Sequence, residues 1–376
     1  MPEGSLKILN WNLAGAKYLE LPLRAKTLNS VPEKTREGFK EKLNDVLKDL
    51  IRRHTPDVIT LQEVVCYEEN GDAKSAIHIV DPGADYLENY DYLPHWLIDT
   101  QHHSATGKWN KARKTGGWPK DAYFAQGNAI LIRRTIPYFR PFDLPAIRQS
   151  LNDKINNRIE PVKLESGLYL GDRNTEPRAA LVTHLVLSQL KNRHNQEPLK
   201  RPLDIFIINL HLTTLVGERE GIPEVDEEAA QTRLRQLDIV LNGIISRYNK
   251  WAKEGFKIRG EKVDPRDGET HERHKPIWVI AGDFNFTPDS FEYQALIRRG
   301  YIDLIQNHDL GTKTSGLGEN PTLTVDYVFA GPRFETIHPD VAKKGTVQNH
   351  VEITEDTRVS DHFPLVVSLP IALNEP

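Results

Sequence analysis

The strongest constraint on the fold is a series of short apolar runs that begin or end at polar groups. The run from Ile277 to Ala281 leads directly into the tetrapeptide Gly282 to Asn285, and the tripeptide Ser360 to His362 comes just before the run from Pro364 to Leu369. Runs of this length that are rich in Ile, Val and Leu indicate buried strands. Carboxylate, amide and imidazole groups are therefore expected at strand ends, where they can bind metal ions and transfer protons.

Four further motifs have the same arrangement of an apolar run and a polar group. They are Ile8 to Asn12, Val58 to Glu63, Gly127 to Leu131 and Ile207 to Leu212. One such motif alone is a weak signal, because short strings of Asp, Asn and His often form turns or helix caps. Six of them along the chain indicate one site that is assembled from the ends of several strands.

Segments with a helical period lie between these runs. One helix is expected from Ser30 to His54, a second from about Asp226 to Tyr248, and a shorter one that follows Pro288 and stops at Gly300. The expected strands are Lys7 to Leu13, Val58 to Leu61, Ala129 to Ile132, Ala180 to Leu187, Ile205 to Leu210, Ile277 to Ala281, Val325 to Phe329 and Leu365 to Leu369. The alternation of strands and helices predicts the α/β class.

The domain organisation follows from the spread of the motifs. Because one site needs residues from both ends of the chain, we expect a single catalytic domain over residues 1–376 rather than the two or three domains that the length alone suggests. Three stretches are longer than ordinary loops, at about 66–126, 137–204 and 252–276, and they are interpreted as insertions.

Composition excludes some classes of protein. The hydrophobic content of 38% supports a sizeable core, while 27% charged residues and the lack of a long apolar run argue against a membrane span. No signal peptide is visible at the N-terminus, and a single cysteine, Cys66, fits a reducing compartment, so a cytoplasmic location is expected. The net charge of -4 does not by itself indicate nucleic-acid binding, and nothing in the sequence indicates an oligomeric state.

The six motifs resemble those of the endonuclease/exonuclease/phosphatase family, the magnesium-dependent phosphoesterases that include pancreatic-type deoxyribonucleases, AP endonucleases and deadenylases. The resemblance extends from Asn12 to His362. It implies a four-layered α/β sandwich, with two central mixed β-sheets flanked by helices. Asp, Glu and Asn oxygens suit Mg²⁺ or Mn²⁺, and no cluster of Cys and His suggests structural zinc, so Mg²⁺ or Mn²⁺ is the expected cofactor.

The resemblance implies five catalytic residues. Asp283 would orient or deprotonate the attacking water, and Asn285 would position the water or the phosphate. His362 would contact the phosphate and handle a proton or stabilise charge, with Asp326 orienting its ring. His211 would be the second histidine, which donates to a phosphate oxygen or protonates the leaving group.

The metal site would include Glu63 as the main ligand. Asn12 is similar to the family residue that assists at the metal or the phosphate, and Asp361 is similar to the carboxylate that joins the metal directly or through water. Asn128 is either a substrate contact or a turn residue. Arg233 and Gln236 resemble polar positions on a family helix, although a solvated helix face explains them equally well.

One stretch of the sequence favours a nucleic-acid substrate. Thr100 to Lys120 contains no acidic residue, and its basic groups alternate with tryptophans. The substrate-binding residues expected there are Lys111, Arg113, Lys114 and Trp109. Basic groups can follow a phosphate backbone while an indole stacks on a base. A solvated loop whose tryptophans pack on the protein body is the alternative.

The motifs narrow the choice of activity. The Val64-Val65 pair after Glu63 disfavours AP endonucleases, which usually have a lysine there, and the stretch Thr324 to Tyr327 disfavours inositol polyphosphate 5-phosphatases. We therefore predict a divalent-metal-dependent phosphodiesterase that hydrolyses DNA or RNA by in-line attack of an activated water. The alternatives are a phosphoesterase for a small phosphorylated metabolite or phospholipid headgroup, and a noncatalytic binding protein on the same scaffold.

Overall fold

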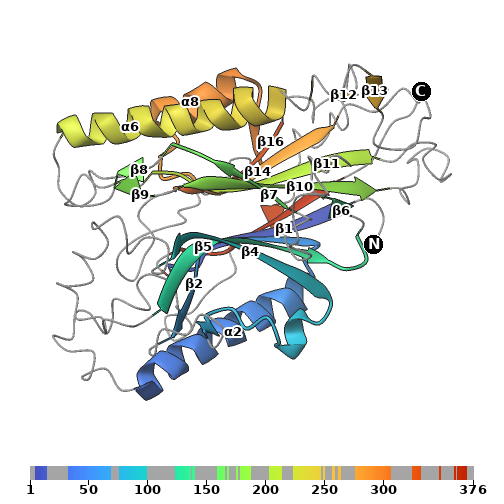
Figure 1. Cartoon of the computed structure of the whole chain (residues 1–376), viewed down its shortest axis with the longest axis vertical. Coiled ribbons are helices and arrows are strands. Elements are labelled where there is room, and N and C mark those ends of the chain that lie inside the picture. The colour runs from blue at the N-terminus through green and yellow to red at the C-terminus, as the bar shows by residue number, and fades with distance from the viewer. Residues whose placement is uncertain are drawn as a thin grey trace.

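Two seven-stranded β-sheets pack face to face, and helices cover their outer faces (Figure 1). This arrangement is the four-layered α/β sandwich that the sequence predicts, with both sheets mixed. The computed structural model describes residues 5–14, 33–68, 76–99, 123–136, 138–139, 159–165, 167–168, 175–176, 178–187, 203–213, 223–246, 249, 256–258, 261–263, 276–305, 324–331, 347–348, 360 and 362–370.

The first sheet is built around the parallel pair β1 and β2. Its strands, in spatial order, are β17 (Val347–Gln348), β18 (Leu365–Pro370), β1 (Ser5–Asn12), β2 (Val58–Glu68), β5 (Tyr123–Arg133) and β4 (Tyr90–Asp99), while β3 (Ile77–His78) pairs with β2. The other pairings are antiparallel. The crossover between β1 and β2 contains α2 (Glu33–His54), which lies on the outer face, and the 3₁₀ turn η3 (Asp85–Leu87) precedes β4.

The second sheet has the same plan around the parallel pair β11 and β14. Its order is β15 (Ile302–Asp303), β16 (Asp326–Ala330), β14 (Ile277–Asp283), β11 (Leu203–His211), β10 (Ala179–Leu187) and β6 (Tyr138–Phe139), with β7 (Glu160–Lys163) paired to β10. The crossover contains α6 (Pro223–Asp238) and its π-helical continuation η5 (Ile239–Ile245), and α8 (Phe291–Arg298) follows β14. Two small hairpins are β8 (Gly167–Leu168) with β9 (Thr175–Glu176), and β12 (Phe256–Ile258) with β13 (Glu261–Val263).

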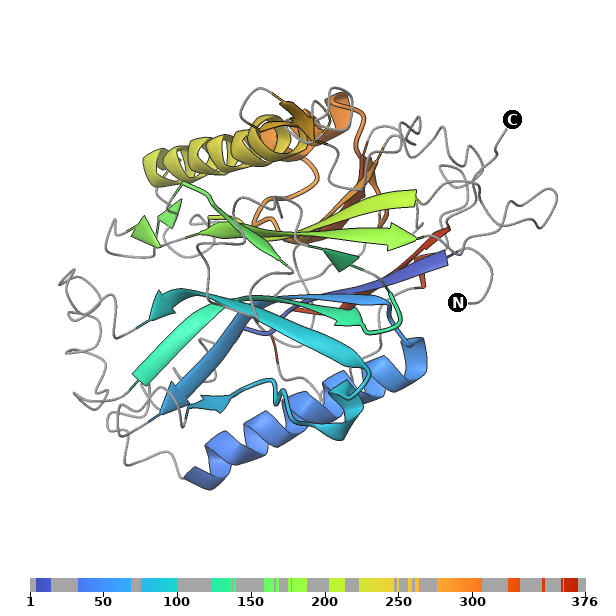
Figure 2. The same cartoon turned by 45° about the vertical axis from the view of Figure 1, so that its right-hand side comes forward.

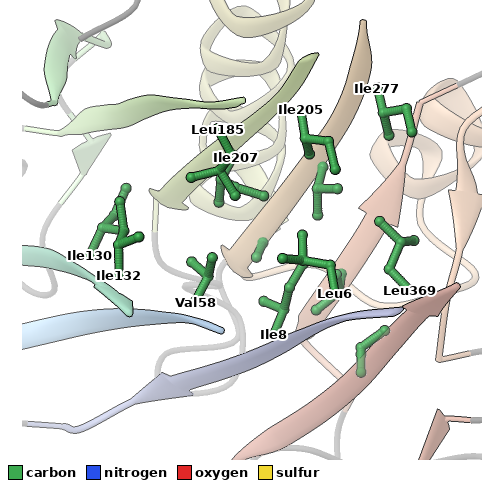
Figure 3. Packing of buried hydrophobic residues seen from close by; sticks show 14 of the residues in the cluster. Leu6, Ile8, Val58, Ile130, Ile132, Leu185, Ile205, Ile207, Ile277 and Leu369 are labelled. Atoms are coloured by element: carbon green, nitrogen blue, oxygen red, sulfur yellow. The ribbon is translucent and has the colours of Figure 1, made fainter. Parts of the chain in front are cut away.

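Alternating side chains divide the apolar residues into layers. Inward-facing residues such as Ile8, Val58, Ile207 and Val279 form one cluster between the two sheets (Figure 3). Outward-facing residues pack under α2 on one side and under α6, η5 and α8 on the other, which lie on opposite faces of the molecule (Figure 2). The period of two in the strands and of 3.6 in the helices therefore produces three apolar layers that hold four layers of backbone together.

A layer of buried polar side chains follows the apolar core along the central strands. Gln62 on β2 donates from Nε2 to Asn10 Oδ1 at 2.9 Å and to Asn209 Oδ1 at 2.7 Å, and Thr60 Oγ1 donates to Asn10 Oδ1 at 2.8 Å. Asn209, on β11 of the other sheet, donates to the carbonyl oxygens of Leu61 and Ala129 at 3.0 and 2.8 Å. The hydrogen bonds of Asn209 join the two sheets directly.

Several element boundaries differ from those predicted. The structure begins α2 at Glu33, and residues 15–32 lie outside the described part. Within the stretch 66–126, which the sequence suggested as an insertion, β4 is a ten-residue strand of the first sheet. The other two predicted insertions lie largely outside the described residues, so the single domain over 1–376 stays a prediction. No helix among the residues that the structure describes is both long and apolar enough to cross a membrane.

Candidate active site

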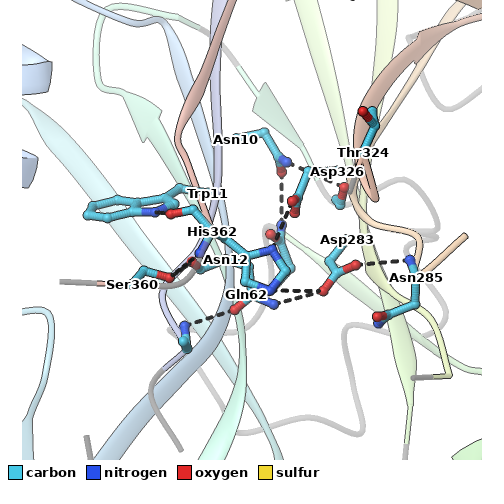
Figure 4. Close-up of polar contacts among 12 residues, drawn as sticks. Asn10, Trp11, Asn12, Gln62, Asp283, Asn285, Thr324, Asp326, Ser360 and His362 are labelled. Carbon is cyan, nitrogen blue, oxygen red and sulfur yellow. Dashed lines mark hydrogen bonds and ion pairs between the residues drawn. The ribbon is translucent and has the colours of Figure 1, made fainter. Parts of the chain in front are cut away.

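Five of the predicted site residues, Asn12, Asp283, Asn285, Asp326 and His362, lie together between the two sheets (Figure 4). Asn12 ends β1, His211 ends β11 and Asp283 ends β14, while Glu63 lies within β2. Parallel strands have their carboxyl ends at the same edge, so each parallel pair brings two polar groups together. Hydrogen bonds and close contacts then connect the groups of one sheet to those of the other.

The Asp283 carboxylate lies at the centre of this group. Its Oδ2 accepts a hydrogen bond from Asn12 Nδ2 at 2.9 Å and lies 3.5 Å from His211 Nε2 and 3.8 Å from His362 Nε2. Its Oδ1 accepts from the backbone N–H of Asn285 at 2.9 Å. Burial, with the nearby Asp326 carboxylate adding to it, raises the pKa of Asp283 to about 7, so this carboxyl can release and accept a proton near neutral pH.

Both the ring and the backbone of His362 are held by contacts with neighbouring residues. Its Nδ1 lies 2.8 Å from Asp326 Oδ2, which fixes the ring so that Nε2 faces Asp283. The indole N–H of Trp11 donates to the His362 carbonyl oxygen at 3.0 Å. Ser360 Oγ accepts from His362 N at 3.0 Å and donates to the Asn12 carbonyl oxygen at 2.7 Å, so the last motif of the chain is fixed to its first strand.

His211 and Glu63 complete the described part of the site. Burial lowers the pKa of His211 well below its usual range, and the positive charges of Arg178 and His362 lower it further, so the ring is neutral at pH 7. Glu63 Oε1 lies 4.0 Å from His211 Nε2. The register of β2 against β5 shifts between Leu61 and Val64, and Glu63 has a φ of 53°, so a β-bulge turns its side chain toward the site.

Glycine is required directly before Asp283. Gly282 has a φ of +153°, and a Cβ at this position would lie 1.9 Å from the Leu210 carbonyl oxygen. Any side chain would therefore separate β14 from β11 at the Leu210–Gly282 position, next to the His211–Asp283 pair of the register. The Gly-Asp dipeptide of the sequence thus has a steric reason as well as a chemical one.

Glu63 is a carboxylate that could hold a hard divalent cation. Its side chain is 20% exposed, so it can reach a metal ion at the edge of the site, while Asp283 and Asp326 are buried. Asp283, Asp326 and His362 also lie close enough to hold a metal ion. Asp326 and His362 already share a hydrogen bond, so this triplet can also handle protons, and the metal at Glu63 stays a prediction.

Asn12 contacts two carboxylates of the site through its side-chain amide. Its Oδ1 accepts a hydrogen bond from the backbone N–H of Ala14 at 2.9 Å. Because a backbone N–H can only donate, this contact fixes the orientation of the Asn12 amide. Its Nδ2 faces Asp283, and lies 3.4 Å from Glu63 Oε1. Asn12 therefore donates hydrogen bonds to two carboxylates of the site, and its part at the metal or the phosphate stays a prediction.

The remaining predicted residues do not join this group in the described structure. Asn128 is buried, and its Nδ2 lies 3.5 Å from the Ala179 carbonyl oxygen of the opposite sheet, so here it connects the sheets and its part in substrate binding stays a prediction. The other predicted residues lie outside the described part of the chain. They are Asp361, Lys111, Arg113, Lys114 and Trp109.

The structure adds residues that the sequence did not single out. Arg178, directly before β10, is buried and is the second contributor to the low pKa of His211. Gln62 was visible only as the neighbour of Glu63, although its position two residues after Thr60 predicts an inward-facing side chain. Arg233 and Gln236 are buried on α6, so the alternative of a solvated helix face is wrong.

Comparisons with known proteins agree with the fold and the motif order. The sequence pattern of the Endonuclease/Exonuclease/phosphatase family matches residues 9–362. An endonuclease/exonuclease/phosphatase from Beutenbergia cavernae DSM 12333 is 17% identical, with a TM-score of 0.50 and coverage of 98% of this chain and 72% of that chain. ANGEL2, a 2',3'-cyclic phosphatase in complex with adenosine-2',3'-vanadate, is 15% identical, with a TM-score of 0.51 and coverage of 99% and 97%.

No curated protein sequence matches the chain significantly. At these identities the two solved structures support the fold, while the family match runs from Leu9 in the first strand to His362. The chain belongs to the Endonuclease/Exonuclease/phosphatase family of metal-dependent phosphoesterases.

Proposed function

We propose that this protein is a divalent-metal-dependent phosphodiesterase that hydrolyses nucleic-acid phosphodiester bonds by in-line attack of water. The observation that carries the hydrolytic part is the buried Asp283 carboxylate, which lies within 4 Å of one nitrogen of each of two histidines. Attack of water on a phosphoester needs a base and groups that stabilise the developing charge. Asp283 and the two imidazoles beside it can supply these groups.

Each group has a separate task in this proposal. Asp283 accepts a proton from the attacking water, and Asn12 and the Asn285 backbone hold its two oxygens. Asp326 orients the ring of His362, whose Nε2 can then donate a hydrogen bond to the phosphate and stabilise the negative charge that develops there. His211 is neutral and can donate one hydrogen bond to a phosphate oxygen without adding a full charge.

Glu63 would hold Mg²⁺ or Mn²⁺, and Asp361 is proposed as a second ligand. The cation would neutralise a nonbridging phosphate oxygen and the developing charge of the transition state. Asn12 keeps the Glu63 carboxylate next to Asp283, so that the ligand and the base face the same space.

The nucleic-acid part of the proposal is supported by the sequence. The stretch Thr100 to Lys120 has basic groups interleaved with tryptophans and no acidic residue. Such a segment can contact phosphates and stack on bases. A compact substrate, such as a phosphorylated metabolite or a phospholipid headgroup, would need only the buried groups and not this segment.

The experiment is hydrolysis of plasmid DNA, single-stranded DNA, RNA and bis(p-nitrophenyl) phosphate with Mg²⁺ or Mn²⁺. Wild type is compared with Glu63→Ala and His362→Ala. Nuclease activity that both variants lose would support the proposal, whereas cleavage of the generic ester alone would favour a small-molecule phosphoesterase. If wild type cleaves no substrate, the noncatalytic scaffold becomes the better interpretation.

The chain offers a matched control for His362→Ala. His184 also forms a buried pair with an aspartate, with its Nε2 2.7 Å from Asp204 Oδ1, but it stacks on Phe206 on the outer face of the second sheet. His184→Ala removes the same kind of contact away from the site. Its turnover per folded molecule should stay within about twofold of wild type, because activity depends on the position of the pair and not on its presence.

A further inference from the structure

A buried ion pair connects two helices behind the proposed catalytic residues. Arg233 on α6 lies with Nε 2.9 Å and Nη2 2.8 Å from Glu292 Oε1, at the start of α8. Each side chain is 3% exposed. Such a pair is weak evidence of a role in stability, because removing two charges from water costs about as much as their attraction returns. Its position relative to the site provides a better explanation.

The same face of α6 holds the segment that follows β11. Gln236 Oε1 accepts from Thr213 N at 2.9 Å, and Gln236 Nε2 donates to Thr213 Oγ1 at 3.0 Å. Arg233 Nη1 donates to the Thr213 carbonyl oxygen at 3.4 Å. All three polar atoms of Thr213 are therefore bound by two side chains that lie one helical turn apart.

The next residue toward the site passes this restraint to Asn285. Leu212 N donates to the Asp283 carbonyl oxygen at 2.9 Å, and Asn285 Nδ2 donates to the Leu212 carbonyl oxygen at 3.2 Å. Asn285 has a φ of 51°, in the left-handed region that asparagine adopts more readily than most other non-glycine residues. This series of hydrogen bonds runs from α6 through Thr213 and Leu212 and ends at the side-chain amide of Asn285.

The ion pair restrains the other side of the same residue. Asn285 lies between β14 and α8, and Glu292 is in the first turn of α8. Arg233 therefore contacts the segment before the site, through Thr213, and the helix that follows it, through Glu292. A change in either contact moves the ends of the connection that contains Asn285.

We propose that Arg233, Gln236 and Glu292 are positioning residues that set the orientation of the Asn285 amide and of His211. This inference rests on the proposed function for its catalytic consequence, because it assumes that Asn285 and His211 contact the phosphate or the water. Its structural part, that the three side chains restrain Leu212, Thr213 and Asn285, is independent of any activity.

The test uses a double variant, Arg233→Met with Glu292→Leu, which replaces the buried charges by apolar groups and leaves neither charge uncompensated. We expect faster backbone hydrogen exchange in the peptides that contain Leu212, Thr213 and Asn285, with unchanged exchange in β1 and α2. With bis(p-nitrophenyl) phosphate, kcat should fall at least fivefold while KM changes less than threefold, because orientation of the reacting groups is lost rather than binding.

Arg235 provides the control on the same helix. It forms an exposed ion pair with Glu165, at 2.7 Å, and Arg235→Met removes a cation two residues from Arg233. Its kcat and its exchange pattern should match those of wild type. If the double variant does not fold, Arg233→Lys keeps a cation beside Glu292 but cannot reach Thr213 with the same group, and it should show the same changes.

The outcomes separate this inference from the proposed function. Unchanged exchange at Leu212, Thr213 and Asn285, or a fall in kcat of less than fivefold in a folded variant, would overturn the positioning role. A wild-type protein that hydrolyses no phosphoester would remove the proposed function, and the exchange measurement would still decide whether the three side chains restrain the segment.

Discussion

Asn209 tests whether the buried amides hold the two sheets together. It is fully buried, and its side chain makes three hydrogen bonds to the opposite sheet, with the carbonyl oxygens of Leu61 and Ala129 and with Gln62 Nε2. Asn209→Ala would remove the partner of each of these groups at once. A buried polar group without its partner costs about 1–3 kcal/mol. Because the three losses are not additive, we expect a decrease of about 3–5 kcal/mol in the free energy of unfolding.

Urea denaturation of the metal-free protein, followed by tryptophan fluorescence, would measure this decrease. Asn209→Asp separates the hydrogen bonds from the cavity, because it keeps the shape and the acceptor for Gln62 but replaces the donor to two carbonyls by a carboxyl oxygen. It should cost at least as much as the alanine variant. Asn89→Ala is the matched control, since Asn89 is exposed and its amide donates to the neighbouring Glu88. It should cost less than about 0.5 kcal/mol.

The reasoning would be refuted by a loss of less than about 1 kcal/mol in Asn209→Ala, or by an aspartate variant as stable as wild type. Either result would mean that the sheets are held by the apolar cluster alone. A double variant with Gln62→Ala gives a second check, because residues that share a hydrogen bond should lose less together than the sum of the single losses.

Three further predictions concern the site itself. Burial raises the pKa of Asp283 to about 7, so the folded protein keeps a proton that the unfolded chain loses above the ordinary pKa of 3.8. The free energy of unfolding therefore falls as pH rises from about 4 to 7. Asp283→Asn should raise the Tm of the metal-free protein more at pH 8 than at pH 4. Gly282→Ala places a Cβ 1.9 Å from a carbonyl oxygen and should cost more than about 3 kcal/mol in urea denaturation. Gly243→Ala, in a helix, places a Cβ 3.8 Å from Ile239 Cγ2 and should stabilise by up to about 1 kcal/mol. Ser360→Ala removes the hydroxyl between Asn12 O and His362 N, and we expect kcat to fall about tenfold with a loss of stability of about 1–2 kcal/mol, measured by steady-state hydrolysis and thermal unfolding.

The positions of the main site residues were predictable from strand periodicity. Asp283 follows an apolar run of five residues, and the structure extends this strand to Asp283 itself. His211 follows another run in the same way and pairs with Asp283 in the parallel register. Two runs that end in polar groups and lie in one parallel pair must bring those groups together, so this part of the site needs no tertiary information beyond the pairing.

Other features depend on tertiary contacts that no local pattern indicates. The bulge that turns Glu63 toward the site interrupts an otherwise regular strand, and the sequence around it contains neither glycine nor proline. The strand β4 was missed because Pro94 and several polar residues weaken its pattern, although it pairs with β5 at the edge of the first sheet. Arg233 was ambiguous because its partner Glu292 is 59 residues away.

The order of side chains along the central strands explains how a charged site can adjoin an apolar core. On β1 and β11, the inward positions change from apolar residues to Asn10 and Asn209 and then, two residues later, to Asn12 and His211. A neutral amide satisfies the backbone carbonyls at the end of the core and needs no counter-charge, so it costs less to bury than a carboxylate. Gln62 joins these two amides across the sheets, and this fixes the distance between the strand ends that carry the site. Apolar side chains alone could pack the two sheets against each other in more than one register. The buried amides allow a single register, because their hydrogen bonds fit only one. Catalytic groups that come from both sheets require such a fixed register.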